Sequence, residues 1–259
     1  MKTLLYHKLL TQREQEKKAQ SGIITDERIM RLPEPMQRYL RFAGVVGKVP
    51  VRTIRLKQRG YMRQRPEQKW MPLEAEQVFS VTPPAFVWRA RMRLAPFGWI
   101  AATDQLSEGH GTMSIKLLSA IPLGNAHGPE MDQGSLVRYL GEIIWFPTAW
   151  LSDYIEWQAI DSSSVKATMH YAGASASLVL SVNEQGQPTI LKANRYMEER
   201  GNYRLTPWSA QCSEFREIDG MYVPTHFDVT WHLPAGDFTW LRADINEIEY
   251  DQSRKVTTF

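Results

Sequence analysis

Arg138 and Glu142 are the side chains best placed to do chemistry in this 259-residue sequence. They lie four residues apart within "SLVRYLGEIIWFPTAW", a stretch rich in leucine, isoleucine and tryptophan, and residues at this spacing are neighbours on a helix. If the pair is exposed to solvent, it contributes only about a few tenths of a kcal/mol and indicates no function. If it faces an apolar cavity, burying the two charges costs free energy, which indicates a function such as binding the polar headgroup of a ligand.

Proton transfer is the alternative role for these groups. A hydrolase or isomerase could use Glu142, Asp104 or a histidine as an acid or base inside such a cavity. The sequence identifies no second partner for Glu142, and it contains no GxSxG, Walker-type or Rossmann pattern. We therefore favour a binding protein over an enzyme, and we expect no cofactor.

A metal site and a reactive thiol are the remaining chemical candidates. His226, Asp228 and His232 share one side of a predicted strand, and histidine and aspartate two residues apart can share a metal. An outward-facing polar surface explains the same pattern, and no HExxH-like group supports a metal, so we expect none. Cys212, the one cysteine, cannot form an intramolecular disulfide and is expected to be a small buried hydrophobe.

The Arg138/Glu142 segment has the pattern of a helix that packs on a core. On a helix from Ser135 to Trp145, four residues form one apolar stripe: Leu136, Leu140, Ile143 and Ile144. Pro147 ends this helix, and a second short helical turn is expected after it. The segment therefore predicts a helical lid over a sheet, at about 134–158.

The chain from Val51 onward alternates apolar and polar residues between turn signals, which predicts about eleven strands. Short links between consecutive strands indicate antiparallel pairing, and a sheet of this size must curl to cover its apolar face. We expect an α+β fold built on a curved, mostly antiparallel half-open barrel. Residues 1–48 are predicted to form an N-terminal helical segment packed on the sheet, and 49–259 a single β domain that carries the helical insertion.

Charge is distributed unevenly. Residues 1–70 hold 17 Lys/Arg and 6 Asp/Glu, a balance of +11, and the rest of the chain holds 14 and 22, a balance of −8. A predicted strand in 51–65 carries six residues on one side: Arg55, Lys57, Arg59, Tyr61, Arg63 and Arg65. One hypothesis is docking on anionic membrane or nucleic acid; the interpretation we favour is a solvated face balanced by the acidic remainder. Few aromatic side chains accompany this face, which disfavours nucleic acid.

The first residues begin like a signal peptide, but His7 and Lys8 interrupt the apolar run and no small-residue cleavage site follows. Leu4, Leu5 and Leu9 instead predict an amphipathic helix, a kind of segment that also binds membrane surfaces. No run approaches the roughly 20 apolar residues of a spanning helix. We expect a cytoplasmic location, with peripheral membrane contact as the open alternative; the sequence does not predict the oligomeric state.

Several stretches resemble a bacterial family of unknown function. They are "LPEPMQRYL" at 32–40, "FVWRARMR" at 86–93 and "RYLGEIIWFPTAWL" at 138–151, and the resemblance extends over about residues 30–250. It implies no activity. Two hairpins, "NEQGQPTILKA" and "IDGMYVPTHFDV", are more loosely similar to bacterial lipoprotein-carrier proteins, which implies a curved sheet over an apolar cavity plugged by helices. The chain departs from those carriers in its lack of a lipobox cysteine.

These patterns together predict a non-enzymatic binding module for a lipid-like or other amphipathic small molecule. Such pockets are mostly apolar and carry a few placed polar groups. Arg138 and Glu142 are expected to meet the headgroup. Four tryptophans are the expected cavity walls: Trp88, Trp145, Trp157 and Trp231.

Overall fold

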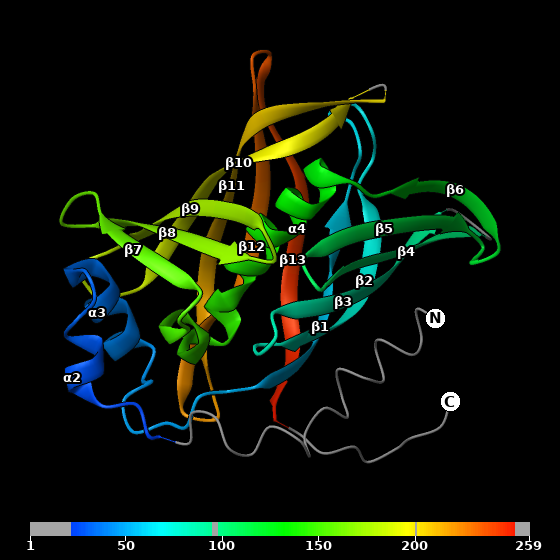
Figure 1. The fold of residues 1–259 in the computed structure, drawn as a ribbon. Helices are drawn as coiled ribbons and strands as arrows, with labels where there is room; N and C mark the ends of the chain where they lie inside the picture. Colours follow the sequence, from blue (N-terminus) through cyan, green and yellow to red (C-terminus); the bar gives the residue numbers. More distant parts are fainter. Residues whose placement is uncertain (1–21, 95–97, 200, 252–259) are drawn as a thin grey trace.

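Thirteen antiparallel strands form one curled sheet (Figure 1) in a computed structural model that describes residues 22–94, 98–199 and 201–251. The strand order is β6-β5-β4-β3-β2-β1-β13-β12-β11-β10-β9-β8-β7. Almost every strand therefore pairs with its neighbours in sequence, and pairing of β1 with β13 joins the two halves. We call β1–β6 the first wing and β7–β13 the second wing.

The strands are β1 Thr53–Met62, β2 Met71–Ser80, β3 Ala85–Leu94, β4 Gly98–Ser107, β5 His110–Leu117, β6 Ile121–Ala126, β7 Ile155–Ala159, β8 Ser164–Tyr171, β9 Ala174–Val182, β10 Pro188–Glu199, β11 Asn202–Ile218, β12 Met221–Leu233 and β13 Gly236–Tyr250. The helices are α2 Asp26–Ile29, α3 Glu34–Phe42 and α4 Pro129–Glu142, with short 3-10 helices η2 Ile143–Trp145 and η3 Pro147–Leu151.

The predicted antiparallel half-barrel is confirmed, although the sheet has thirteen strands where the sequence predicts about eleven. The two additional strands are β6 and β7. Every residue of β6 is exposed or half-buried, so this strand lacks the apolar alternation by which the others are recognised. β7 is short and follows η3 directly, and its residues fall where the sequence pattern predicts only a helical turn and a loop.

Helix α4 lies across the concave face and bridges the two wings (Figure 1). Its main contacts are with β4 and β5 on one side and with β9 and β10 on the other. Small residues allow this close approach: a Cβ added to Gly111 of β5 would lie 2.3 Å from the Oγ of Ser135 in α4. The wings also meet beyond the helix, where a Cβ on Gly109 would lie 2.3 Å from the Cβ of Ala172. The helix therefore packs between the two wings of one sheet.

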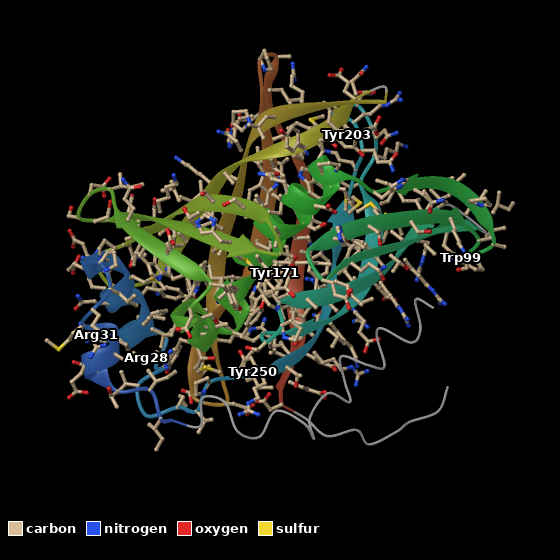
Figure 2. The ribbon with its side chains drawn as sticks, viewed as in Figure 1. Arg28, Arg31, Trp99, Tyr171, Tyr203 and Tyr250 are labelled. Carbon is tan, nitrogen blue, oxygen red and sulfur yellow. The ribbon has the colours of Figure 1, made fainter. Side chains whose placement is uncertain are left out.

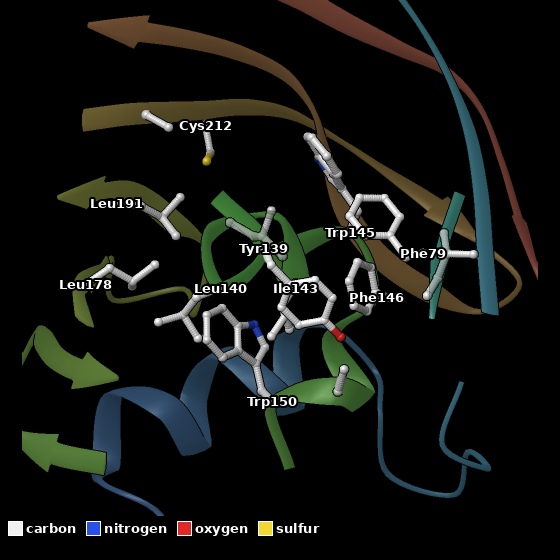
Figure 3. Close-up of a cluster of buried hydrophobic side chains, with 14 of the residues drawn as sticks. Phe79, Tyr139, Leu140, Ile143, Trp145, Phe146, Trp150, Leu178, Leu191 and Cys212 are labelled. Carbon is white, nitrogen blue, oxygen red and sulfur yellow. The ribbon is translucent and has the colours of Figure 1, made fainter. Parts of the chain in front are cut away.

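The predicted lid helix begins earlier than Ser135, at Pro129, and ends at Glu142. Its predicted apolar stripe is confirmed, because Leu136, Leu140 and Ile143 are fully buried and Ile144 is nearly so. Figure 3 shows how the residues after the stripe continue this packing, with Trp145, Phe146 and Trp150 turned into the same cluster as Leu178 and Leu191 of the second wing.

Helix α3 packs against β8 and β9 of the second wing. Met36, Tyr39 and Leu40 of this helix are fully buried, and the Tyr39 hydroxyl donates to the carbonyl of Ile144 at 3.3 Å. Gly44 follows the helix at a φ of 71°, a left-handed conformation that favours glycine. The helix predicted around Leu4, Leu5 and Leu9 lies outside the described residues. None of the described helices is long and apolar enough to cross a membrane.

Candidate ligand-binding site

Gln77, Trp88 and Asp104 form one row across β2, β3 and β4 on the concave face. Gln77 lies opposite Trp88 in the β2–β3 register, and Trp88 lies opposite Asp104 in the β3–β4 register. Strand side chains point alternately to the two faces of a sheet, so all three project toward α4. Gln77 and Asp104 are fully buried, which makes this row the polar part of an otherwise apolar surface.

Arg138 of α4 completes a polar cluster above this row. Its Nε donates to Glu142 Oε1 at 2.9 Å, its Nη1 to Asp104 Oδ2 at 2.6 Å and one further nitrogen to Gln77 Oε1 at 3.2 Å. The Gln77 amide donates in turn to Glu142 Oε2 at 2.7 Å. We call these four residues the polar cluster. One acceptor remains in it, because Asp104 Oδ1 is buried and has no hydrogen-bond partner among the described residues.

Two aromatic rings of β3 contact the guanidinium of Arg138. Its central carbon lies 4.9 Å from the ring centroid of Phe86 and 4.9 Å from that of Trp88, distances at which cation–π attraction is favourable. Trp88 is itself fixed, since its indole nitrogen donates to Gln58 Oε1 at 2.8 Å. Arg138 is therefore positioned by every group around it.

Electrostatics of the cluster reflect its burial. Burial raises the pKa of Glu142 above its ordinary value, and the attraction of Arg138 and the hydrogen bond from Gln77 offset only part of this effect. Both carboxylate oxygens of Glu142 already accept hydrogen bonds. The geometry suits holding a polar group at the edge of an apolar surface.

A row of alanines lies beside the polar cluster. Ala75, Ala90 and Ala102 are opposite one another across β2, β3 and β4, one step along the strands from the polar row. These side chains keep 8%, 5% and 6% of their surface exposed. The next row on the other side contains Phe79 and Phe86, which are both at 0%. The alanine row is therefore nearly buried, and the aromatic row completely so.

The second wing presents small side chains to the same space. Ala210 and Cys212 of β11 each remain 9% exposed, and Ala193 of β10 is half-buried. Together with the alanine row they form a set of small, mostly buried side chains on the concave face, which we call the trough: Ala75, Ala90, Ala102, Ala193, Ala210 and Cys212. Helix α4 contacts β4 and β5 of the first wing and β9 and β10 of the second, so it spans the concave face that carries these side chains.

The structure brings together three of the six residues predicted to bind a ligand, namely Arg138, Glu142 and Trp88. Trp231 lies opposite Trp208 on the second wing and is half-buried. These four residues surround the trough or its polar edge.

Two further predicted tryptophans pack elsewhere in the core. Trp145 contacts the ring of Phe227 at 5.1 Å between centroids and is 4% exposed. Trp157 is in β7, at the edge of the sheet, where its ring lies 5.4 Å from that of Trp150. The four tryptophans predicted to line a cavity are therefore distributed over the concave face, and Trp157 is on the edge strand β7.

Sequence reasoning missed Gln58, Gln77 and Arg195. Each falls on the concave side of its strand by two-residue alternation, among residues such as Leu56 and Leu191. A polar residue in the apolar phase of a strand was the signal that could have found them. Asp104 was considered only as an acid or a hairpin residue, and its pairing with Arg138 depends on a contact that the sequence does not encode locally.

The basic side of β1 faces outward and is neutralised by its neighbours. Lys57 contacts Glu247 at 2.7 Å, Arg59 approaches Glu74 at 3.7 Å, and Arg55 pairs with Glu76. The acidic partners belong to β2 and β13, the two strands that flank β1. This is the arrangement expected of a solvated, balanced face.

The histidines of β12 also face outward. His226 Nδ1 lies 2.6 Å from Asp244 Oδ1, and His232 Nδ1 lies 2.7 Å from Asp237 Oδ1. Within the described part of the chain, no three His, Cys, Asp or Glu side chains gather in a group that could hold a metal ion.

Two hollows lie outside the trough. One, of about 760 Å³, is on the outer face of the first wing, where Arg59, Arg91 and Trp99 line it; Figure 2 shows Trp99 at the far end of that wing. The other, of about 450 Å³, is between the β4–β5 and β8–β9 turns and is lined by His110 and Asp132. Both have mixed polar and apolar linings, unlike the trough.

Comparison with family models matches residues 22–243 to the Family of unknown function (DUF6544). The chain belongs to this family. The resemblance expected from the sequence stretches at 32–40, 86–93 and 138–151 is thereby confirmed. No match emerges among curated proteins.

Three solved structures align with this protein over most of its length. A domain named for outer membrane lipoprotein sorting, from Vibrio parahaemolyticus, is 6% identical with a TM-score of 0.45 and covers 78% of this chain and 87% of its own. A DUF1329 family protein from Desulfovibrio piger is 11% identical, with a TM-score of 0.47 and coverages of 84% and 92%. A LolA superfamily protein from Nitrosomonas europaea is 10% identical, with a TM-score of 0.41 and coverages of 87% and 93%.

Proposed function

We propose that this protein binds a lipid-like, amphipathic small molecule in the trough, without catalysing a reaction on it. The apolar part of the ligand lies on the small side chains of the trough, beneath α4. Its polar end lies toward the polar cluster. Burial of apolar surface contributes about 25 cal/mol per Å², so a long acyl chain gains most of its affinity from this surface.

One observation supports the proposal above the others. The concave side chains on one side of the polar row are small and keep 5–8% of their surface exposed, whereas Phe79 and Phe86 on its other side are large and fully buried. A helix that served only to fill the core would be expected to cover both rows equally. The arrangement instead favours a lid that spans an apolar surface and leaves it open at one side.

The position of the charges also supports a ligand with a polar end. Side chains of Arg138 and Glu142 are 14% and 15% exposed, while that of Asp104 is 1% exposed. The cluster is therefore buried on its sheet side and accessible on the other. A headgroup at this edge can exchange hydrogen bonds with the cluster without breaking the contacts that fix α4.

Direct detection of the ligand tests the proposal. The purified protein is analysed by native mass spectrometry, and an organic extract of it by mass spectrometry. The protein freed of lipid is then titrated with 1-hexadecanol while tryptophan fluorescence is followed. We expect a co-purifying amphipathic compound and saturable binding of the alcohol. An empty protein that also fails to bind the alcohol would contradict the proposal.

A further inference from the structure

Arg195 lies on the concave side of β10, directly opposite Thr206 of β11. Its side chain is half-buried and reaches α4, because a Cβ added to Gly134 would lie 3.5 Å from the Nε of Arg195. The guanidinium therefore faces the space between the second wing and the lid helix, at the end of the helix that precedes Arg138.

No hydrogen bond or ion pair to Arg195 occurs among the residues that the structure describes. A guanidinium carries five N–H donors and no acceptor, and leaving such donors unpaired when they are partly desolvated is costly. Burial lowers the pKa of Arg195 to about 10, against the attraction of Asp104 and Glu142. The group nevertheless stays cationic at neutral pH.

Trp208 supplies a second unpaired donor on the same surface. It lies opposite Ala193, two residues from Arg195 on the same face of β10, and diagonal neighbours of this kind are about 7–8 Å apart. Trp208 is 6% exposed, and its indole Nε1 is buried without a hydrogen-bond partner in the described part of the chain. Two neighbouring side chains that can only donate thus lack an acceptor.

We propose that Arg195 and Trp208 bind the anionic end of the amphipathic ligand, a carboxylate or a phosphate. This inference rests on the proposed function and adds the chemical class of the headgroup. Carboxylate and phosphate oxygens only accept hydrogen bonds, and arginine binds them in a bidentate manner. The negative charges of Asp104 and Glu142 do not oppose such a group strongly, because both are paired with Arg138.

Two probes of equal chain length separate the headgroup from the apolar part. The affinities of palmitic acid and 1-hexadecanol are measured for the wild type, for Arg195→Met and for Lys192→Met. Lys192 is an exposed cation of the same strand, and alternation places it on the outer face. We expect the wild type and Lys192→Met to bind the acid about tenfold or more tightly than the alcohol. Arg195→Met should bind the acid no more tightly than the alcohol, while its affinity for the alcohol stays unchanged.

Equal affinity of the wild type for acid and alcohol would overturn the inference, as would an acid preference that survives in Arg195→Met. The proposed function would still stand in both cases, because the alcohol is bound. If neither probe binds, the proposed function fails and this inference with it.

Two further measurements sharpen the result. Trp208→Phe keeps an aromatic ring, smaller than the indole, and removes the N–H group, so it should weaken binding of the acid and leave that of the alcohol unchanged; an unchanged affinity for the acid would remove Trp208 from the site. Hexadecyl phosphate should bind at least as tightly as palmitic acid. If inorganic phosphate alone bound as tightly as hexadecyl phosphate, the site would be one for a free anion and the headgroup assignment would be wrong.

Discussion

Arg138 and Asp104 join the lid helix to the first wing through a contact of 2.6 Å between Nη1 and Oδ2. The two residues are 34 positions apart in the sequence, and the Asp104 side chain is almost completely buried. This ion pair fixes the distance between α4 and β4, and therefore the space between the helix and the trough.

Loss of Arg138 should destabilise the protein strongly. Arg138→Met leaves Asp104 and Glu142 buried without their cation, and breaking a buried pair in this way costs about 3–5 kcal/mol. Urea unfolding measures the change. Arg41→Met is the matched control, because Arg41 pairs with Asp26 on the surface, where both side chains are nearly half exposed, and little change is expected there. Equal stabilities of the two variants would show that the cluster does not fix α4.

Glu142 should make stability depend on pH. Its pKa is raised by burial above the ordinary value of 4.5, so the protonated form favours the folded state. This contribution is complete below 4.5 and is lost as the pH rises through the raised folded value. Over that window, the unfolding free energy of the wild type should therefore fall relative to that of Glu142→Gln, which cannot ionise. Urea titrations of both proteins from acid to neutral pH measure the difference; a constant difference would contradict the assignment.

Two glycine substitutions test where α4 lies. Gly134→Ala places a Cβ in ordinary contact with Arg195 and should stabilise the helix by about 0.4–1 kcal/mol. Gly111→Ala places a Cβ 2.5 Å from the backbone oxygen of Met131 and should destabilise the protein by about 1–3 kcal/mol. Thermal unfolding of the two variants shows whether each substitution raises or lowers stability. A stabilising Gly111→Ala would mean that α4 is farther from β5 than the structure shows.

Cys212 should react slowly with thiol reagents. Burial raises the pKa of its thiol to about 12, so little thiolate is present at mildly alkaline pH. Reaction with dithionitrobenzoate should be far slower in the folded protein than in urea. Because Cys212 belongs to the trough, saturating 1-hexadecanol should slow the reaction further. If the alcohol binds but does not change this rate, the ligand lies elsewhere.

The sheet and the lid were predictable because both depend on local patterns. Alternation along 51–65 identified the outward side of β1, which carries Lys57 and Arg59, and the helical stripe from Leu136 to Ile144 identified the packed face of α4. β6 and β7 were missed because short edge strands bury few side chains and so carry little alternation. The interpretation of Cys212 as a small buried hydrophobe also agrees with its burial.

The site was predictable only in part. Spacing on one helix revealed that Arg138 and Glu142 can pair, but the partners Asp104 and Gln77 come from strands whose register is set by the whole sheet. The same is true of Arg195, which lies near the cluster only because α4 brings the two wings together. Contacts between distant segments depend on the curvature of the sheet, and a local pattern holds no information about it.

Filling the trough tests the central claim most directly. Ala90→Phe adds a ring to the alanine row, and Ala101→Phe adds the same ring to the neighbouring strand; Ala101 lies opposite Arg91 and faces the outer side. Titration with 1-hexadecanol, followed by tryptophan fluorescence, should show that binding is lost in Ala90→Phe and unchanged in Ala101→Phe, with both proteins folded by circular dichroism. Full binding by a folded Ala90→Phe, or loss of binding only in Ala101→Phe, would contradict a ligand site beneath the lid.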